Sequence, residues 1–119
     1  MPTVLVVDDS DFTRRMMRKT LEANGLEVKE ANSGKQALDI YADQPTDLVL
    51  LDLLMPIMEG EEVLTRLKEI DPEVRAIICS SNVQSSKQKE LVDLGAKDYL
   101  IKPAKADILM AAINKALSA

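Results

Sequence analysis

Several residue types that often carry chemistry are missing from this sequence. It has no histidine and no tryptophan, and its one cysteine is Cys79. The absence of histidine excludes histidine-based catalysis and most zinc sites. A lone cysteine cannot form an intramolecular disulfide, which indicates a reducing compartment. Because only 3% of the residues are aromatic, few rings are available to stack on nucleic-acid bases.

Basic charge and long apolar runs are also scarce. The chain has 15 basic and 20 acidic residues, and this net charge of −5 argues against direct contact with nucleic acid. The first apolar run stops at Asp8 and has no basic segment before it, so it is not a signal peptide. No run is long enough to span a bilayer. We therefore expect a cytoplasmic protein without membrane insertion.

Glycine is rare as well, and this bears on nucleotide binding. The chain has four glycines, and neither G-x-G-x-x-G nor G-x-x-x-x-G-K-[ST] follows the first apolar run. These loops bring backbone N–H groups close to phosphates in dinucleotide and mononucleotide sites. A flavin or nucleotide module is therefore not favoured.

Short apolar runs alternate with amphipathic stretches along the 119 residues. We expect strands over residues 3–7, 26–31, 47–51, 74–79 and 98–101. Helical patterns follow each of them, and the last covers residues 104–117. Strands that are apolar on both faces and alternate with helices predict a parallel sheet with helices on each side. The sequence therefore predicts one three-layer α/β domain over residues 1–119.

Apolar side chains recur in the expected helices, with the 3.6-residue spacing of one helix face in the first and third and on the inner side of the last. Serines at 10 and 33 are expected N-caps, and Gln36 completes a capping box with Ser33. The expected apolar positions are Phe12, Met16, Met17 and Leu21 in the first helix, Val63, Leu64, Leu67 and Ile70 in the third, Leu91, Val92 and Leu94 in the fourth, and Ile108, Leu109, Ala112, Ile113 and Ala116 in the last.

Polar residues gather where the expected strands end. Asp8-Asp9 follow the first strand, Asp52 the third, Ser80 the fourth and Lys102 the fifth. In open α/β sheets the carboxyl ends of the strands form the ligand site. Converging carboxylates suit Mg²⁺ or Mn²⁺, and a lysine and a hydroxyl can bind phosphoryl oxygens. A carboxylate can itself accept a phosphoryl group as an acyl phosphate.

Four motifs in order carry a family resemblance. They are DD at 8–9, D-x-x-M-P-x-x-x-G at 52–60, a hydroxyl at Ser80 and K-P at 102–103. Together they span the whole chain and resemble the receiver (CheY-like) domain of two-component response regulators. The resemblance implies a doubly wound (βα)5 sheet with strand order 2-1-3-4-5, which is the order in the chemotaxis receiver.

The resemblance also implies residue roles at the metal site. Asp52 would be the phosphoacceptor. Asp8, Asp9, Asp52 and the backbone carbonyl of Leu54 would hold Mg²⁺ or Mn²⁺. Because Leu54 has no polar side chain to orient an attacking water, we expect slow loss of the phosphoryl group.

Three further residues are implied to respond to the phosphoryl group. Ser80 would bond a phosphoryl oxygen and Lys102 would pair with its charge. Ser80 and Tyr99 would form the switch. In this family the Lys102–Pro103 bond is usually cis, which proline makes accessible at small cost.

The implied function is that of a stand-alone receiver with no output domain, in chemotaxis or a phosphorelay. A sensor histidine kinase or a phosphotransfer protein would phosphorylate it, and a target protein would bind the face of the fourth helix, fifth strand and fifth helix. We expect no turnover of an external substrate.

Three alternatives remain open. One is an Asp-nucleophile phosphatase, although Leu54 stands where that enzyme needs a second carboxylate. Another is a receiver fragment of a longer DNA-binding regulator. The third is a pseudo-receiver that switches by binding alone, against which the complete set of acids and lysine argues.

Overall fold

The computed structural model describes residues 1–55 and 57–118, so Pro56 of the Met-Pro motif lies outside the described residues. Within them, strands and helices alternate along the chain. Their bounds are β1 Thr3–Val7, α1 Asp11–Ala23, β2 Glu27–Ala31, α2 Gly34–Asp43, β3 Leu48–Leu51, α3 Gly60–Ile70, β4 Ala76–Ser80, α4 Ser85–Asp93, β5 Asp98–Ile101 and α5 Ala106–Ser118. The main shift from the sequence prediction is in β4, which begins two residues later than expected and includes Ser80.

The strands form one parallel sheet in the order β2-β1-β3-β4-β5. This confirms the predicted doubly wound topology. The chain starts with β1 near the middle, adds β2 on one side and then continues with β3, β4 and β5 on the other. β1 and β3 are therefore neighbours, with Val7 paired to Leu51, and the residues that follow these two strands emerge side by side.

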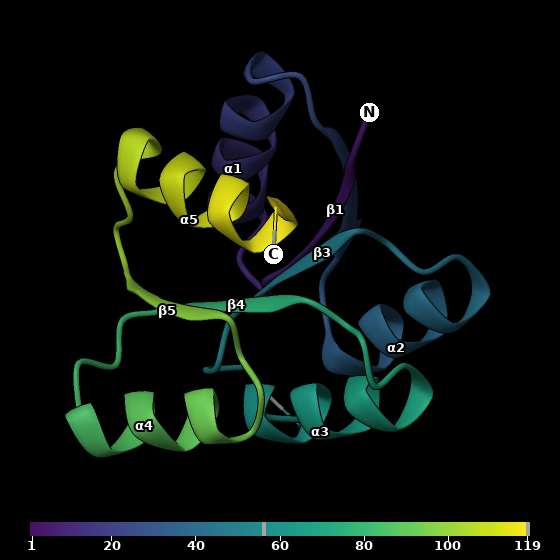
Figure 1. The fold of residues 1–119 in the computed structure, drawn as a ribbon, viewed down its shortest axis with the longest axis vertical. Helices are drawn as coiled ribbons and strands as arrows, with labels where there is room; N and C mark the ends of the chain where they lie inside the picture. The colour runs from purple at the N-terminus through teal and green to yellow at the C-terminus, as the bar shows by residue number, and fades with distance from the viewer. Residues whose placement is uncertain (56, 119) are drawn as a thin grey trace.

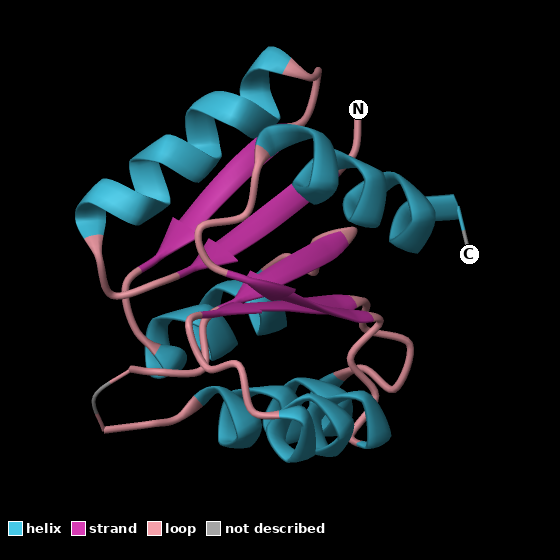
Figure 2. Ribbon diagram, turned by 90° about the vertical axis from the view of Figure 1, so that its left-hand side faces the viewer, coloured by secondary structure: helices cyan, strands magenta, loops and turns pink. Residues whose placement is uncertain are grey.

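Helices cover both faces of the sheet, as Figure 1 and Figure 2 show. Helices α1 and α5 lie on one face, where Leu21 and Ile113 pack against Val4 and Val6. Helices α2, α3 and α4 lie on the other face. There, fully buried side chains of each helix pack against alternate residues of the same strands; they include Ala37, Tyr41, Leu64, Leu67 and Leu91. The fold therefore has three layers, as predicted.

Two serines begin helices as expected. The Ser10 hydroxyl accepts a hydrogen bond from the Thr13 N–H, and the Ser33 hydroxyl accepts one from the Gln36 N–H. The capping box at the second site is only partly formed. The Gln36 side chain accepts from the N–H of Asn32, one residue before the cap.

Several apolar residues of the expected helical patterns are exposed, among them Ile108, which was expected on the inner side of the last helix. These are Phe12 (74% exposed), Met16 (50%), Ile70 (45%), Val92 (51%), Leu94 (39%) and Ile108 (53%). Spacing gives the period of an apolar stripe but not its centre. In α1 the stripe that meets the sheet runs through Met17 and Leu21, and Phe12 and Met16 lie beside it. Among the described residues, no helix is both long enough and apolar enough to cross a bilayer.

Candidate functional site

Asp8 follows β1 directly and is held in place by its backbone and its side chain. Its N–H donates to the Ala31 carbonyl at the end of β2, at 3.1 Å. One carboxylate oxygen accepts from the Ser10 N–H at 2.8 Å, and the other accepts from Lys102 Nζ at 2.6 Å. The residue is only 2% exposed. A buried carboxylate with these partners has a fixed position.

Asp52 follows β3, the strand beside β1. Its N–H donates to the Val7 carbonyl at 3.0 Å, which continues the ladder of the sheet. One of its carboxylate oxygens accepts from the Leu54 N–H at 3.3 Å, and the other lies 3.5 Å from Lys102 Nζ. Burial raises the pKa of Asp52, Lys102 lowers it, and the nearby charge of Asp8 raises it again. Lys102 therefore does not fully offset the cost of keeping the Asp52 carboxylate ionised in its buried position.

The carboxylates of Asp8, Asp9 and Asp52 converge, as the sequence predicted. One oxygen from each lies within 4.8 Å of the others; Asp8 and Asp52 are buried and Asp9 is exposed to solvent. Lys102 contacts this cluster in ion pairs with Asp8 and Asp52. Three carboxylates against one ammonium group leave net negative charge, and their oxygens are the ligands that Mg²⁺ prefers. The donor set fits a divalent cation with one side open to solvent.

Lys102 comes immediately after β5 and reaches across the sheet edge. Its N–H donates to the Ser80 carbonyl at 2.9 Å, and its bond to Pro103 is cis, as expected from the sequence. Burial alone would lower the pKa of its amine. The hydrogen bond to Asp8 and the charges of Asp52 and Asp8 outweigh this effect and raise the pKa. The amine therefore stays protonated.

Ser80 and Tyr99 both form hydrogen bonds with the backbone of Asn82. The Ser80 hydroxyl, which is fully buried, accepts from the Asn82 N–H at 3.1 Å. The Tyr99 hydroxyl donates to the Asn82 carbonyl at 2.8 Å. The loop after β4 therefore connects the two residues predicted to form the switch. Leu54 contacts Asp52 through its N–H, and the role of its carbonyl remains a prediction.

Gly60 explains the glycine at the end of the D-x-x-M-P-x-x-x-G motif. A Cβ atom there would lie 2.7 Å from the Asp52 carbonyl oxygen and 2.8 Å from Leu53 Cα. The Gly60 N–H also donates to the Leu53 carbonyl at 3.1 Å. Glycine thus lets α3 start directly against the backbone of Asp52.

Arg14 is a site residue that the sequence analysis missed. Its Nη1 donates to the backbone carbonyl of Asp8 at 2.7 Å, and its Nε donates to Glu30 at 2.9 Å. One signal in the sequence could have identified it. Arg14 occurs three and seven residues before Met17 and Leu21, so a basic residue stands in the apolar stripe of α1.

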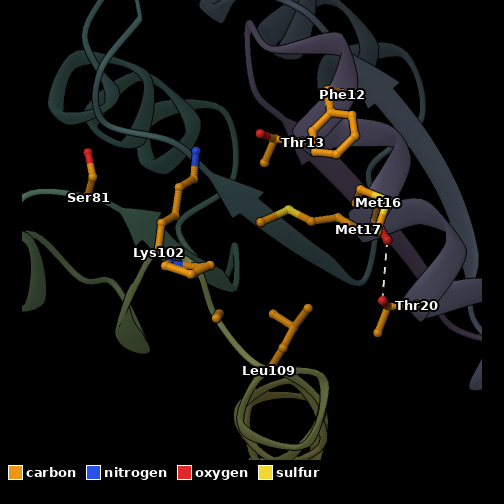
Figure 3. A pocket seen from close by; sticks show the side chains of 10 residues that line it. Phe12, Thr13, Met16, Met17, Thr20, Ser81, Lys102 and Leu109 are labelled. Atoms are coloured by element: carbon orange, nitrogen blue, oxygen red, sulfur yellow. Dashed lines mark hydrogen bonds between the residues drawn. The ribbon is translucent and has the colours of Figure 1, made fainter.

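An apolar groove of about 570 Å³ lies beside the site, between α1 and α5. Figure 3 shows Phe12, Met16 and Met17 on one side, Leu109 on the other, and Lys102 at the edge. The exposed apolar residues of α1 thus line a groove instead of the core. Its lining is mostly apolar, whereas the carboxylates and Lys102 form the polar centre next to it.

Comparison with known sequences identifies close relatives of this chain. The family model described as response regulator receiver domain matches residues 4–114. The chemotaxis protein CheY of Bacillus subtilis is 42% identical over 116 residues, which cover 97% of each chain.

Solved structures show the same similarity. A response regulator receiver domain protein from Clostridium thermocellum has a TM-score of 0.94 at 31% identity, covering 99% of this chain and 95% of that one. The CheX-CheY-BeF3-Mg²⁺ complex from Borrelia burgdorferi has a TM-score of 0.92 at 28% identity, with 95% of this chain and 87% of that chain covered.

Proposed function

Because this chain belongs to the response regulator receiver family, we propose that it is a phospho-switch of two-component signalling with Asp52 as the phosphoacceptor. One observation carries the choice of residue. Asp52 is a buried carboxylate at the centre of the sheet edge, with Asp8 and Asp9 on one side and Lys102 within 3.5 Å. Each of these neighbours has a chemical use in phosphoryl transfer.

In the proposed transfer, a carboxylate oxygen of Asp52 attacks phosphorus. The bond from phosphorus to the donor, a histidine nitrogen of a kinase or phosphotransfer protein, breaks, and its electron pair leaves with that nitrogen. Lys102 can move from Asp8 towards a phosphoryl oxygen of the product, and the Ser80 hydroxyl is the proposed donor to another. Bound Mg²⁺, held by Asp8, Asp9, Asp52 and the Leu54 carbonyl, would supply positive charge for the phosphoryl oxygens.

The phosphoryl group would be removed by a second displacement, hydrolysis, in which water attacks phosphorus and releases phosphate and the free Asp52 carboxylate. The Leu54 side chain is apolar and 56% exposed, so it offers no group to orient that water. We propose slow self-dephosphorylation for this reason. A long-lived adduct suits a switch and does not suit turnover of an external substrate.

The switch would act through Ser80, Asn82 and Tyr99. A phosphoryl group that draws the Ser80 hydroxyl towards it competes with the Asn82 N–H, and the Tyr99 hydroxyl holds the carbonyl of that same residue. The loop before α4 would then shift, as a charge-driven switch requires. The α4-β5-α5 face, with exposed Val92, Ile101 and Ile108, is the proposed surface for a target protein.

We further propose that the receiver functions by itself in the cytoplasm, in chemotaxis or a phosphorelay. The supporting observation is that 97% of the CheY relative from Bacillus subtilis matches 97% of this chain. The buried free thiol of Cys79 also suits a reducing compartment.

Acetyl phosphate provides the test, because it needs no kinase. The protein is incubated with Mg²⁺ and acetyl phosphate, and its intact mass is measured. We expect one phosphoryl adduct, which EDTA prevents and Asp52→Asn abolishes. Asp93→Asn, at an exposed position in α4, is the matched control and should retain the adduct. An adduct that persists in Asp52→Asn, or continuous phosphate release without an adduct, would contradict the proposal.

A further inference from the structure

We propose that Arg14 is a positioning residue for the metal site, because its guanidinium group holds the Asp8 backbone and so determines where the Asp8 and Asp9 carboxylates lie. This role rests on the proposed function in one point only, namely that the bound cation assists phosphoryl transfer to Asp52. Arg14 would not touch the metal or the phosphoryl group.

The Arg14 side chain makes three separate contacts from one planar group. Nη1 donates to the Asp8 carbonyl at 2.7 Å, Nε donates to Glu30 at 2.9 Å, and Nη2 pairs with Asp11 at 2.5 Å. The side chain is 12% exposed. Because the guanidinium fork is rigid, fixing two of its nitrogens fixes the direction of the third. The Asp8 carbonyl therefore has a donor whose position is set independently.

Glu30 anchors this arrangement to the sheet. It lies in β2 opposite Val6 of β1, and it also pairs with Arg18 at 2.5 Å. The next residue of β2, Ala31, accepts the hydrogen bond from the Asp8 N–H. The Asp8 residue is thus held at its N–H by β2 directly and at its carbonyl by β2 through Glu30 and Arg14. This double attachment lies where the chain leaves the sheet and turns into α1.

The carboxylates depend on that backbone position. Asp8 and Asp9 are adjacent in sequence, so the Asp8 carbonyl belongs to the peptide group that joins them. Rotation of this peptide would move the Asp9 carboxylate relative to Asp8 and Asp52, whose oxygens now lie within 4.8 Å. Groups that orient metal ligands from outside the coordination shell typically contribute 10- to 100-fold to metal affinity.

If Arg14 positions the ligands, replacing it should lower the metal affinity. If Arg14 contributes only its charge, replacing it should raise the metal affinity. Arg14 is a cation near a cation site, so removing only its charge should strengthen divalent-metal binding. Removing its hold on the Asp8 carbonyl should weaken binding. Arg15, the next residue of α1, is exposed and carries the same charge. Arg15→Gln is therefore a matched control for the loss of one positive charge.

Metal affinity can be measured directly with Mn²⁺, because free Mn²⁺ gives an electron paramagnetic resonance signal that is lost on binding. We expect Arg14→Gln to bind Mn²⁺ about 10-fold more weakly than the unmodified protein, or weaker still. Arg15→Gln should bind equally well or slightly better. Arg14→Lys retains the charge but has one nitrogen in place of the fork, so an intermediate affinity is expected.

Folding is checked by thermal unfolding without metal. If Arg14→Gln does not fold, Arg14→Lys and Glu30→Gln carry the test, since each loosens the attachment and keeps a basic side chain at position 14. An Arg14→Gln variant that is folded and binds Mn²⁺ as tightly as Arg15→Gln overturns the inference, as does normal affinity in both substitute variants.

The two proposals fail in different ways. Weak Mn²⁺ binding by Arg14→Gln supports the positioning role even if acetyl phosphate leaves no adduct on Asp52. Conversely, normal Mn²⁺ binding by this variant overturns the positioning role even if Asp52 is phosphorylated.

Discussion

Lys102 lies closer to Asp8 than to Asp52: its amine is 2.6 Å from an Asp8 oxygen and 3.5 Å from an Asp52 oxygen. This amine therefore compensates the charge of Asp8, a carboxylate proposed to bind the cation. A divalent cation bound there would compete with the lysine for Asp8, and its binding would favour movement of the amine towards Asp52. The same residue would then be free for the phosphoryl group.

Lys102→Met should separate these two effects. With the ammonium group removed, the carboxylates lose their counter-charge, so we expect metal affinity to rise about threefold to tenfold, in line with charge interactions at a partly exposed site. Phosphorylation by acetyl phosphate at saturating Mg²⁺ should fall about 100-fold, because a donor to the phosphoryl oxygens is lost. Mn²⁺ titration and intact-mass time courses measure the two quantities. Weaker metal binding would contradict the competition.

Gly60→Ala should disturb the site through the backbone. The added Cβ would lie 2.7 Å from the Asp52 carbonyl oxygen. Because this oxygen belongs to the backbone, the clash can be relieved only if the main chain shifts. We expect the free energy of unfolding to fall by about 2–3 kcal/mol and metal affinity to fall with it. Gly25→Ala is the control. Its φ of +82° is strained for alanine, but no atom lies within 4 Å, so it should cost about 1 kcal/mol and leave metal binding unchanged. Urea unfolding measures the free energy of unfolding of both variants.

Cys79 should be unreactive in the folded protein. It is 1% exposed, and burial raises its pKa to about 11, with smaller contributions from the nearby charges. At pH 8 only about one thiol in a thousand would be ionised, and the reactive form is the thiolate. We expect no labelling by a disulfide reagent at pH 8 until urea unfolds the chain. Rapid labelling without urea would show that β4 opens locally.

The Glu30 ion pairs should make stability depend on acid pH. The hydrogen bond from Arg18 lowers the pKa of Glu30 below 4.5; burial opposes this, and Arg14 adds to it. Folding thus favours the ionised form of Glu30. Its contribution to stability is complete above pH 4.5, the pKa in the unfolded chain, and is lost as the pH falls through the lower pKa of the folded protein. Glu30→Gln should be less stable than the unmodified protein by about 1 kcal/mol at pH 7. The difference between the two should narrow as the pH falls below 4.5.

The control for this pH dependence is Glu69→Gln, at an exposed position of α3. Substitutions at such surface positions usually change stability by less than about 0.5 kcal/mol. Urea unfolding at pH 7 and pH 3 compares all three proteins. A stability gap for Glu30→Gln that is equally large at both values would show that packing, and not charge, is responsible.

The fold and the acidic cluster were predictable from sequence because both follow from local patterns. A parallel sheet brings its strand ends to one edge, so residues 8, 9, 52 and 102 could be placed together once five apolar strands were recognised. The strand order itself came from the family resemblance, and the sheet confirms it.

Contacts that depend on the rotation of a helix do not follow from the positions of the strand ends. The spacing of Phe12, Met16, Met17 and Leu21 was correct for a helix, but the helix is turned so that Arg14 faces the sheet. The link between Ser80 and Tyr99 was equally inaccessible, because it passes through backbone atoms of Asn82, which no side-chain pattern reveals.

The ion pair between Asp8 and Lys102 joins residues 94 positions apart. On a ribosome, Asp8 and Asp52 emerge long before Lys102, and the site lacks its cation until β5 and the residue after it have been synthesised. A chain that ends before β5 could not form this ion pair. Almost the whole fold must therefore be in place before the buried Asp8 carboxylate gains its basic partner.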